Sequence, residues 1–180
     1  VRHSISSLPP LRSRLSKADS RSAWREIVTT LASNLISEAE SQAQEALAKD
    51  AETQSLKTLA RQLRADELEI GKTFETGAVR YHRLKAQEPD STYCNWVKDD
   101  RLEVWLNHES RSHMPSDLGR YFYTAVFGRA FRRTPKGHRE FALKGLAPEH
   151  ANWKTGKFID RFRVQLWDLP STTVTSHIAK

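Results

Sequence analysis

The chain has 180 residues, a length that suits one domain with a helical arm. Hydrophobic residues make up 38% and charged residues 28%, so a core can form while much of the chain faces water or a partner. The single cysteine, Cys94, excludes an internal disulfide and a multi-cysteine zinc site, and we expect a buried structural thiol in a reducing, cytoplasmic setting. No apolar run approaches the roughly 18 residues of a membrane span and no signal-peptide pattern is present, so no membrane partner is expected.

Positive charge gathers in the second half of this chain, whose formal net charge is +7. Residues 1–75 contain eleven Lys and Arg and eleven Asp and Glu, whereas residues 111–167 contain twelve and four. Such an asymmetry is typical of a face that binds a polyanion, above all nucleic acid. The simpler alternative is a basic surface that only keeps the protein soluble.

An extended segment followed by helices is predicted for the first 70 residues. Pro9 and Pro10 exclude a helix within residues 1–18, and Asp19 or Ser20 can cap the helix that follows. Residues 19–70 are expected to form a helical hairpin or one long helix with a solvated outer face. Its apolar positions recur at three-to-four spacing: Trp24, Ile27, Val28, Leu31, Leu35 and Ala39, then Leu56, Leu59, Ala60 and Leu63.

Short strands are predicted after Gly71, where β-branched and aromatic residues become frequent. The two candidate segments are "TFETGAVRYHRL" (73–84) and "RLEVWLNHES" (101–110). A turn is expected at "EPDST" (88–92), and Asp99-Asp100 is a second candidate turn.

Residues 71–167 as a whole are expected to form a basic α+β module with two to three short helices. Ser116 can cap one helix, which contains Gly128 or ends near it. "HREFALKGL" predicts another helix, ending at Gly145, and "KFIDRFRVQLW" (157–167) alternates like a strand. The residues expected on the inner face of the first of these helices are Leu118, Phe122, Ala125 and Val126.

The stretch "NHESRSHMP" (107–115) holds two histidines, His108 and His113. Their spacing of five differs from the four that places two zinc ligands on one helix face, so we do not expect a metal site. Acid–base cleavage of nucleic acid by His108, His113 or His138 with neighbouring cations is a physical alternative. More often, histidines beside arginines are surface or phosphate-contacting groups.

Three segments in order resemble the variable region of bacterial DNA cytosine-5 methyltransferases. "VRHSISSLPPLRSRLSK" (1–17) is similar to the segment by which these enzymes leave their catalytic domain, and "NHESRSHM" (107–114) to an Asn-His-x-x-Arg-x-His element. "DRFRVQLWDLPSTTVTSHIAK" (160–180) resembles the return, so residues 168–180 are expected to lead back to that domain. Residues 20–105 match only loosely, as expected of a region that varies with the DNA target.

The resemblance implies a target-recognition region rather than a complete enzyme. The family binds S-adenosylmethionine at a Phe-x-Gly-x-Gly loop and uses the cysteine of Pro-Cys-Gln, and neither is present; Cys94 lies between Tyr93 and Asn95. No catalytic residue and no cofactor is therefore expected in these 180 residues, and S-adenosylmethionine belongs to the intact enzyme. The implied partners are double-stranded DNA and the catalytic domain. A stand-alone nucleic-acid-binding protein and a small histidine-dependent nuclease are the alternatives.

Lysines and arginines that hold phosphates, and polar side chains that read bases, are what such a region requires. The densest cluster is expected to contact phosphates, with base readout from the same loop or from the strands before it; a solvated loop is the alternative. In "WKTGK" (153–157), Gly156 allows close approach to phosphate. The resemblance places Arg161 and Arg163 near the DNA backbone. The expected DNA-binding residues are Asn107, His108, Arg111, His113, Arg129, Arg132, Arg133, Lys136, His138, Arg139, Lys154, Lys157, Arg161 and Arg163.

Overall fold

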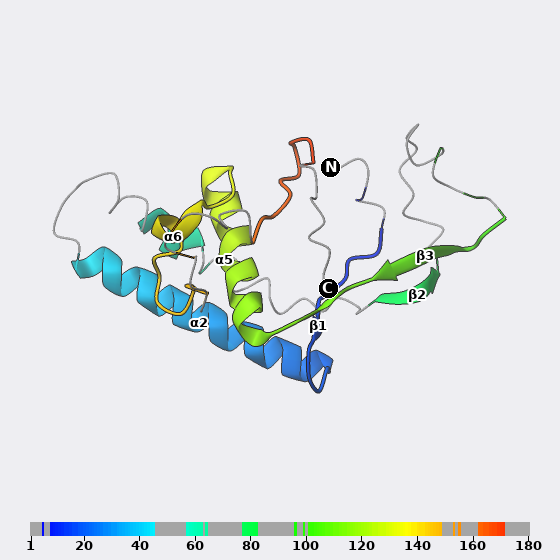
Figure 1. Cartoon of the computed structure of the whole chain (residues 1–180), viewed down its shortest axis with the longest axis horizontal. Helices are drawn as coiled ribbons and strands as arrows, with labels where there is room; N and C mark the ends of the chain where they lie inside the picture. The colour runs from blue at the N-terminus through cyan, green and yellow to red at the C-terminus, as the bar shows by residue number, and fades with distance from the viewer. Residues whose placement is uncertain are drawn as a thin grey trace.

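The computed structural model describes residues 5, 8–45, 57–62, 64, 77–82, 96, 99, 101–148, 153, 155 and 162–171, with residues 77–82 described by their backbone. The chain is α+β, as the sequence predicts. Figure 1 shows one helix crossing another and a two-stranded ribbon to one side of them. The elements are β1 (Arg14–Leu15), α2 (Arg21–Glu45), β2 (Gly77–His82), β3 (Val104–Glu109), β4 (Ser112–His113), α5 (Pro115–Phe131) and α6 (Gly137–Glu140).

Helix α2 begins after Ser20, whose Oγ accepts a hydrogen bond from the amide of Ala23 at 3.1 Å. Of the two caps that the sequence allows, the serine is therefore the one used. Asp19 instead accepts the amide of Leu15 at 3.0 Å and pairs with Arg12 at 2.7 Å, which fixes the approach to the helix. The buried face confirms the middle of the predicted stripe and extends it: Val28, Ala32, Leu35, Ile36, Ala39 and Ala43.

A second helical stretch, residues 57–62, packs into the same core as α2. Leu59 and Ala60 are 3% and 7% exposed. Arg64 donates two hydrogen bonds to the carboxylate of Glu40, one of them at 2.7 Å from Nη2 to Oε2. The two helical stretches therefore lie side by side, as a hairpin requires. Leu56 and Leu63 lie outside the described residues.

Helix α5 begins differently from the sequence prediction. Met114 occupies the N-cap position and Pro115 the first turn, with no capping hydrogen bond from a side chain, so the prediction that Ser116 caps this helix is wrong. Proline suits that position because its missing N–H would have no partner there. Gly128 lies within the helix, as expected, whereas Ala125 is exposed rather than inward. Ala125 misses the core because α5 is covered on two sides, by α2 and by residues 162–166, which leaves one narrow solvent-facing strip.

Helix α6 ends at Glu140, so the prediction of a helix reaching Gly145 is wrong. Phe141, Leu143 and Leu146 are all 2–3% exposed. A helix would turn positions 141 and 143 to different faces, so the chain leaves the helix in order to bury both. Gly145 takes a left-handed φ of 86°, which glycine adopts without strain.

The predicted strand at 157–167 is not formed in its described part, 162–167. The alternation itself is present, with Val164 and Leu166 more covered than Arg163. These side chains pack on α5 instead of pairing with another strand. A methyl group on Gly128 would lie 3.1 Å from Leu166 Cδ2 and 3.3 Å from Val164 Cγ2, so the missing side chain permits this close approach.

Both strands predicted between residues 73 and 110 are present, and β2 pairs antiparallel with β3, with Arg80 opposite Leu106. A turn precedes β3, in which Arg101 donates its amide to Asp99 Oδ1 at 3.0 Å, at the predicted position. β1 pairs in parallel with β4. The expected turn at 88–92 and Cys94 lie outside the described residues.

Two apolar clusters hold the described part of the chain together. The smaller one joins Leu15, Val28 and Leu118. The larger one lies between α2, the second helical stretch, α5 and the segments that follow α5. Gly119 of α5 faces the Leu31 side chain of α2, where a methyl group would lie 3.3 Å from Cδ2. None of the described helices combines the length and the apolar character that crossing a membrane demands.

Candidate nucleic-acid interface

The lead-in segment, residues 9–15, runs beside the "NHESRSH" segment, residues 107–113. His108 Nε2 lies 2.7 Å from the carbonyl oxygen of Pro9, which is 99 residues earlier in the chain. Arg14 donates from Nε to the carbonyl of Ser110 at 3.0 Å, and β1 pairs with β4. Two of the three segments that resemble the methyltransferase family, the first and the second along the chain, therefore lie side by side and share backbone hydrogen bonds.

The third segment connects with these two through aromatic rings. The His113 and Tyr121 rings pack edge-to-face with their centroids 5.1 Å apart, and Tyr121 packs in the same way on Phe162 at 5.3 Å. Phe162 is 8% exposed and has a φ of 59°, a conformation that is strained for an aromatic residue. The surrounding rings therefore hold the return segment, residues 162–168, in a fixed path against α5.

The two histidines of "NHESRSH" have separate packing roles. His108 contacts the lead-in segment and His113 contacts Tyr121. In the described part of the chain no group of three or more His, Cys, Asp or Glu residues is placed to hold a metal ion. Both rings hold segments together.

Asn107, directly before His108, and Arg111, three residues after it, are both exposed. Asn107 has a φ of 56°, which asparagine tolerates better than most residues. The carbonyl of Arg111 accepts a hydrogen bond from the amide of Arg14 at 3.0 Å, and the residue is exposed. Arg111 therefore offers a cation beside the lead-in segment.

Arg133 holds the loop after α5 and is not a free cation. It donates to both carboxylate oxygens of Glu140, one at 2.8 Å, and its guanidinium lies 5.0 Å from the centre of the Phe127 ring. The hydrogen bond from Arg133 lowers the pKa of Glu140, partial burial opposes this, and a hydrogen bond from the Lys136 amide adds to the lowering. The same pair raises the pKa of Arg133.

Arg132 is also paired, but weakly. It donates to Asp168 of the return segment at 3.2 Å, and the two side chains are 66% and 50% exposed. An exposed pair of this kind contributes less than about 1 kcal/mol. Arg132 could therefore exchange its carboxylate for a phosphate at little cost, in contrast to Arg133.

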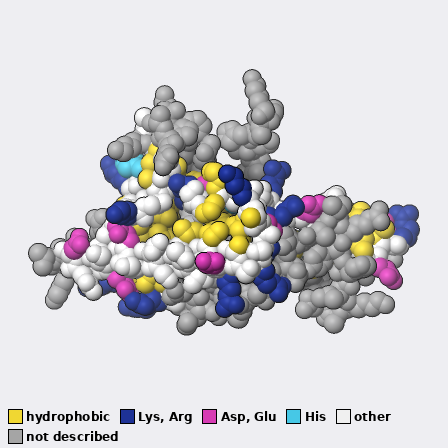
Figure 2. Space-filling model, turned by 90° about the horizontal axis from the view of Figure 1, so that it is seen from below, with side chains coloured by type: hydrophobic (Ala, Val, Ile, Leu, Met, Phe, Trp, Pro, Cys, Tyr) yellow, Lys and Arg dark blue, Asp and Glu magenta, His cyan; other side chains and the backbone are white. Residues whose placement is uncertain are grey.

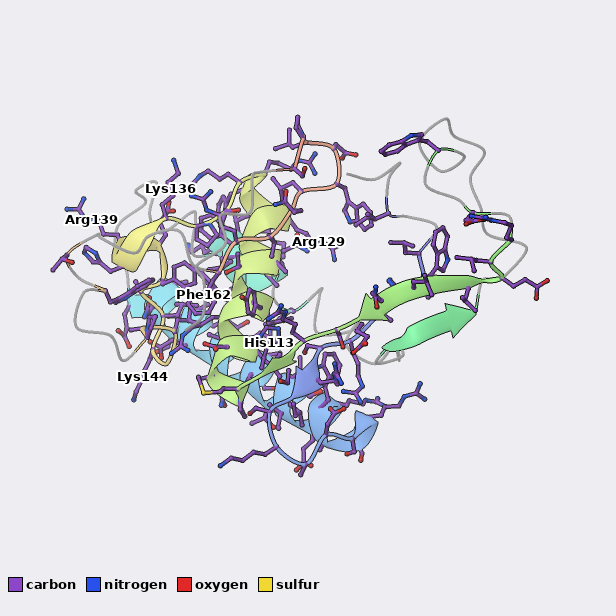
Figure 3. All side chains as sticks on the ribbon, turned by 45° about the vertical axis from the view of Figure 1, so that its right-hand side comes forward. His113, Arg129, Lys136, Arg139, Lys144 and Phe162 are labelled. Atoms are coloured by element: carbon purple, nitrogen blue, oxygen red, sulfur yellow. The ribbon has the colours of Figure 1, made fainter. Side chains whose placement is uncertain are left out.

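Four exposed basic residues around α6 form what we call the α6 basic patch: Lys136, His138, Arg139 and Lys144. Figure 3 shows Lys136, Arg139 and Lys144 projecting from the α6 side of the molecule, whereas Arg129 projects from the side of α5 nearer β3. The cluster expected from the sequence is thus divided between two sides. Lys144, four residues after the end of α6, was not among the residues expected from the sequence.

The remaining candidates are distributed elsewhere. Arg163 is exposed on the return segment, and Lys154, Lys157 and Arg161 lie outside the described residues. Figure 2, which views the molecule from below relative to Figure 1, shows lysine and arginine side chains spread along the visible face rather than gathered at one point. The described cations therefore suit a long, evenly charged ligand better than a compact anion.

The α6 basic patch and Arg111 have the chemistry of phosphate contact, namely exposed cations set in loops and short elements. Arg133 and His108 instead make contacts within the protein, Arg133 with Glu140 and His108 with the carbonyl of Pro9. Comparison of the chain with protein families, with curated proteins and with solved structures finds no match.

Proposed function

We propose that this chain is the target-recognition region of a bacterial DNA cytosine-5 methyltransferase acting in the cytoplasm. In this proposal it holds duplex DNA while a separate catalytic domain, with bound S-adenosylmethionine, transfers the methyl group. Modification of a ring carbon requires the base to leave the stack, so a second module must hold the flanking duplex and read it. The resemblance of three ordered segments supports the proposal.

The observation that carries it is the meeting of these three segments around α5. A region inserted into another domain must leave and return at neighbouring places. The lead-in segment touches His108 and β4, and β4 connects through Tyr121 to Phe162 of the return segment. This series of contacts between segments separated by most of the chain supports the proposal.

DNA contact is assigned mainly to the α6 basic patch, with Arg111 and Arg129 as further phosphate contacts. Arg133 is withdrawn from the set because Glu140 neutralises it. Each lysine or arginine that neutralises a phosphate releases counterions, so binding by this surface weakens steeply with salt.

Binding of the 180-residue chain to duplex DNA, measured by fluorescence anisotropy over a series of salt concentrations, tests the proposal. Wild type should show a negative slope of log affinity against log salt. The double variant Lys136→Ala/Arg139→Ala should bind more weakly and reduce that slope by about 2. Lys57→Ala/Arg61→Ala removes two exposed cations from the second helical stretch and is the matched control.

Absence of duplex binding, binding without salt dependence, or equal losses in the two double variants would each count against the proposal. Transfer of radiolabelled methyl groups to DNA by this 180-residue chain alone would overturn the assignment of the chemistry to another domain.

A further inference from the structure

Strands β2 and β3 form an antiparallel ribbon that lies apart from the crossed helices (Figure 1). Among the described strands, these two pair only with each other, while β1 pairs with β4. A two-stranded ribbon without further cover is marginally stable in water. Among the described residues of the ribbon, exposed side chains of β3 leave a surface that a partner could cover.

Three side chains of β3 are exposed to solvent, and two neighbouring ones, Leu106 and Asn107, are uncharged, while the third is Glu109. Leu106 is 53% exposed, and the next residue, Asn107, is exposed as well. In a regular strand successive side chains point to opposite faces. The left-handed φ of Asn107 interrupts this alternation, so an apolar group and an amide stand exposed next to each other.

The described part of the ribbon carries charges of both signs. Arg101 is paired with Asp99 at 2.7 Å and Glu109 with Arg14 at 3.1 Å, while Arg80 of β2 lies opposite Leu106 in the register. Two further exposed cations lie near the base of the ribbon. Arg111 is two residues after the end of β3, and Arg129 projects from the side of α5 nearer β3 (Figure 3).

We infer that this ribbon enters the major groove of duplex DNA and that Leu106 and Asn107 read base edges there. The inference rests on the proposed function and assigns its sequence readout to one element. A major groove about 12 Å wide admits a two-stranded ribbon. Leucine packs against the thymine methyl group and asparagine forms paired hydrogen bonds with adenine, so neither contact requires a cation. Cations at the ribbon's base hold the phosphates on either side.

The experiment selects preferred sequences from a pool of random duplexes with wild type, Leu106→Ala and Asn107→Gly. Glycine retains the left-handed backbone and removes only the amide side chain. Each ribbon variant should reduce discrimination at one base pair by about tenfold, while the affinity for random duplex and the salt slope remain those of wild type. Lys136→Ala/Arg139→Ala should do the reverse, lowering affinity for every sequence without changing the preferred one.

Four outcomes would overturn the inference, and the proposed function survives the first three. In the first, wild type binds duplex DNA without sequence preference. In the second, the ribbon variants keep the wild-type preference, and in the third, the ribbon variants lose affinity for all sequences equally. The second of these is the result expected if the ribbon docks on protein. In the fourth, wild type binds no duplex at all and the proposed function fails too. Thermal unfolding of both ribbon variants should match wild type, since both side chains are exposed.

Discussion

Arg120 lies in the middle of α5 and is only 7% exposed. It donates to the carbonyls of Leu146 and Ala147 at 2.8 and 3.1 Å and to the carboxylate of Asp117 at 2.7 Å, and its guanidinium lies 5.5 Å from the centre of the Phe162 ring. One buried side chain thus connects the helix, the loop after α6 and the return segment. A buried cation that is satisfied in this way is costly to remove because its partners stay buried.

Arg120→Met should lower the free energy of unfolding by about 3 kcal/mol, since Asp117 and two carbonyls lose their donor. Urea denaturation measures this difference. Arg132→Met is the control, because its pair with Asp168 is exposed and its loss should cost less than about 1 kcal/mol. Equal effects of the two substitutions would contradict the role given to Arg120.

Glu140 makes stability depend on pH. Its folded-state pKa lies below the ordinary value of 4.5, chiefly because Arg133 donates to it. A lowered carboxyl pKa contributes stability above the unfolded-state value, and this contribution disappears as the pH falls through the folded-state value.

Glu140→Gln should therefore cost about 1–2 kcal/mol at pH 7 and progressively less below pH 4.5. Urea denaturation of both proteins at intervals from pH 7 to pH 3 measures the difference. Glu103→Gln changes an exposed carboxylate and serves as the control. A difference that stays constant across this range would show that the charge of Glu140 is not the cause.

At the scale of elements, the two long helices begin in different ways. Ser20 caps α2 through the amide of Ala23, whereas Ser116 lies inside α5 behind Pro115. Ser20→Ala should lower the free energy of unfolding by about 1 kcal/mol, and Ser116→Ala should leave it within about 0.5 kcal/mol of wild type. Thermal unfolding followed by circular dichroism compares them. A larger loss in Ser116→Ala would indicate that the serine has a partner that its position does not explain.

Local signals in the sequence predicted several elements correctly. The apolar spacing gave the stripe of α2, the alternation gave β3, and Ser20 was one of two possible caps. The end of α6 and the path of residues 162–167 could not be predicted in this way. Both depend on the surface that α5 presents, including the bare backbone at Gly128.

The candidate site was predicted as a set of residue types but not as an arrangement. Arg133 is neutralised by Glu140, seven residues away, and that acid was visible in the sequence. The partner of Arg132 is Asp168, 36 residues away, which only the fold brings near. Arg129 lies on a different side of the molecule from Lys136 and Arg139. It shares the exposed strip of α5 with Ala125, and it projects from the side of α5 nearer β3 rather than toward α6.

At the scale of the whole molecule, α2 and α5 each contribute to both apolar clusters. Leu15 brings the lead-in segment into the smaller cluster and is 7% exposed. Because the same two helices continue into the larger cluster, loss of the smaller one should weaken the described fold as a unit.

Leu15→Ala should lower the free energy of unfolding by about 3 kcal/mol. Urea transitions followed by far-ultraviolet circular dichroism and by tryptophan fluorescence should move together and remain single. Leu169→Ala, at a residue that is 49% exposed, should leave the transition in place. Two separate transitions in Leu15→Ala would show that the clusters unfold independently.

The contact between His108 and Pro9 has a consequence for the order in which the protein is made. Its two residues are 99 positions apart, so the carbonyl of Pro9 has no such partner until His108 has left the ribosome. Synthesis at 5 to 20 residues per second makes that delay roughly 5 to 20 seconds. During this time α2 can form, but Leu15 and Val28 await Leu118, the third member of their cluster. The lead-in segment is thus expected to find its packing partners only after the ribbon strand and the start of α5 have been synthesised.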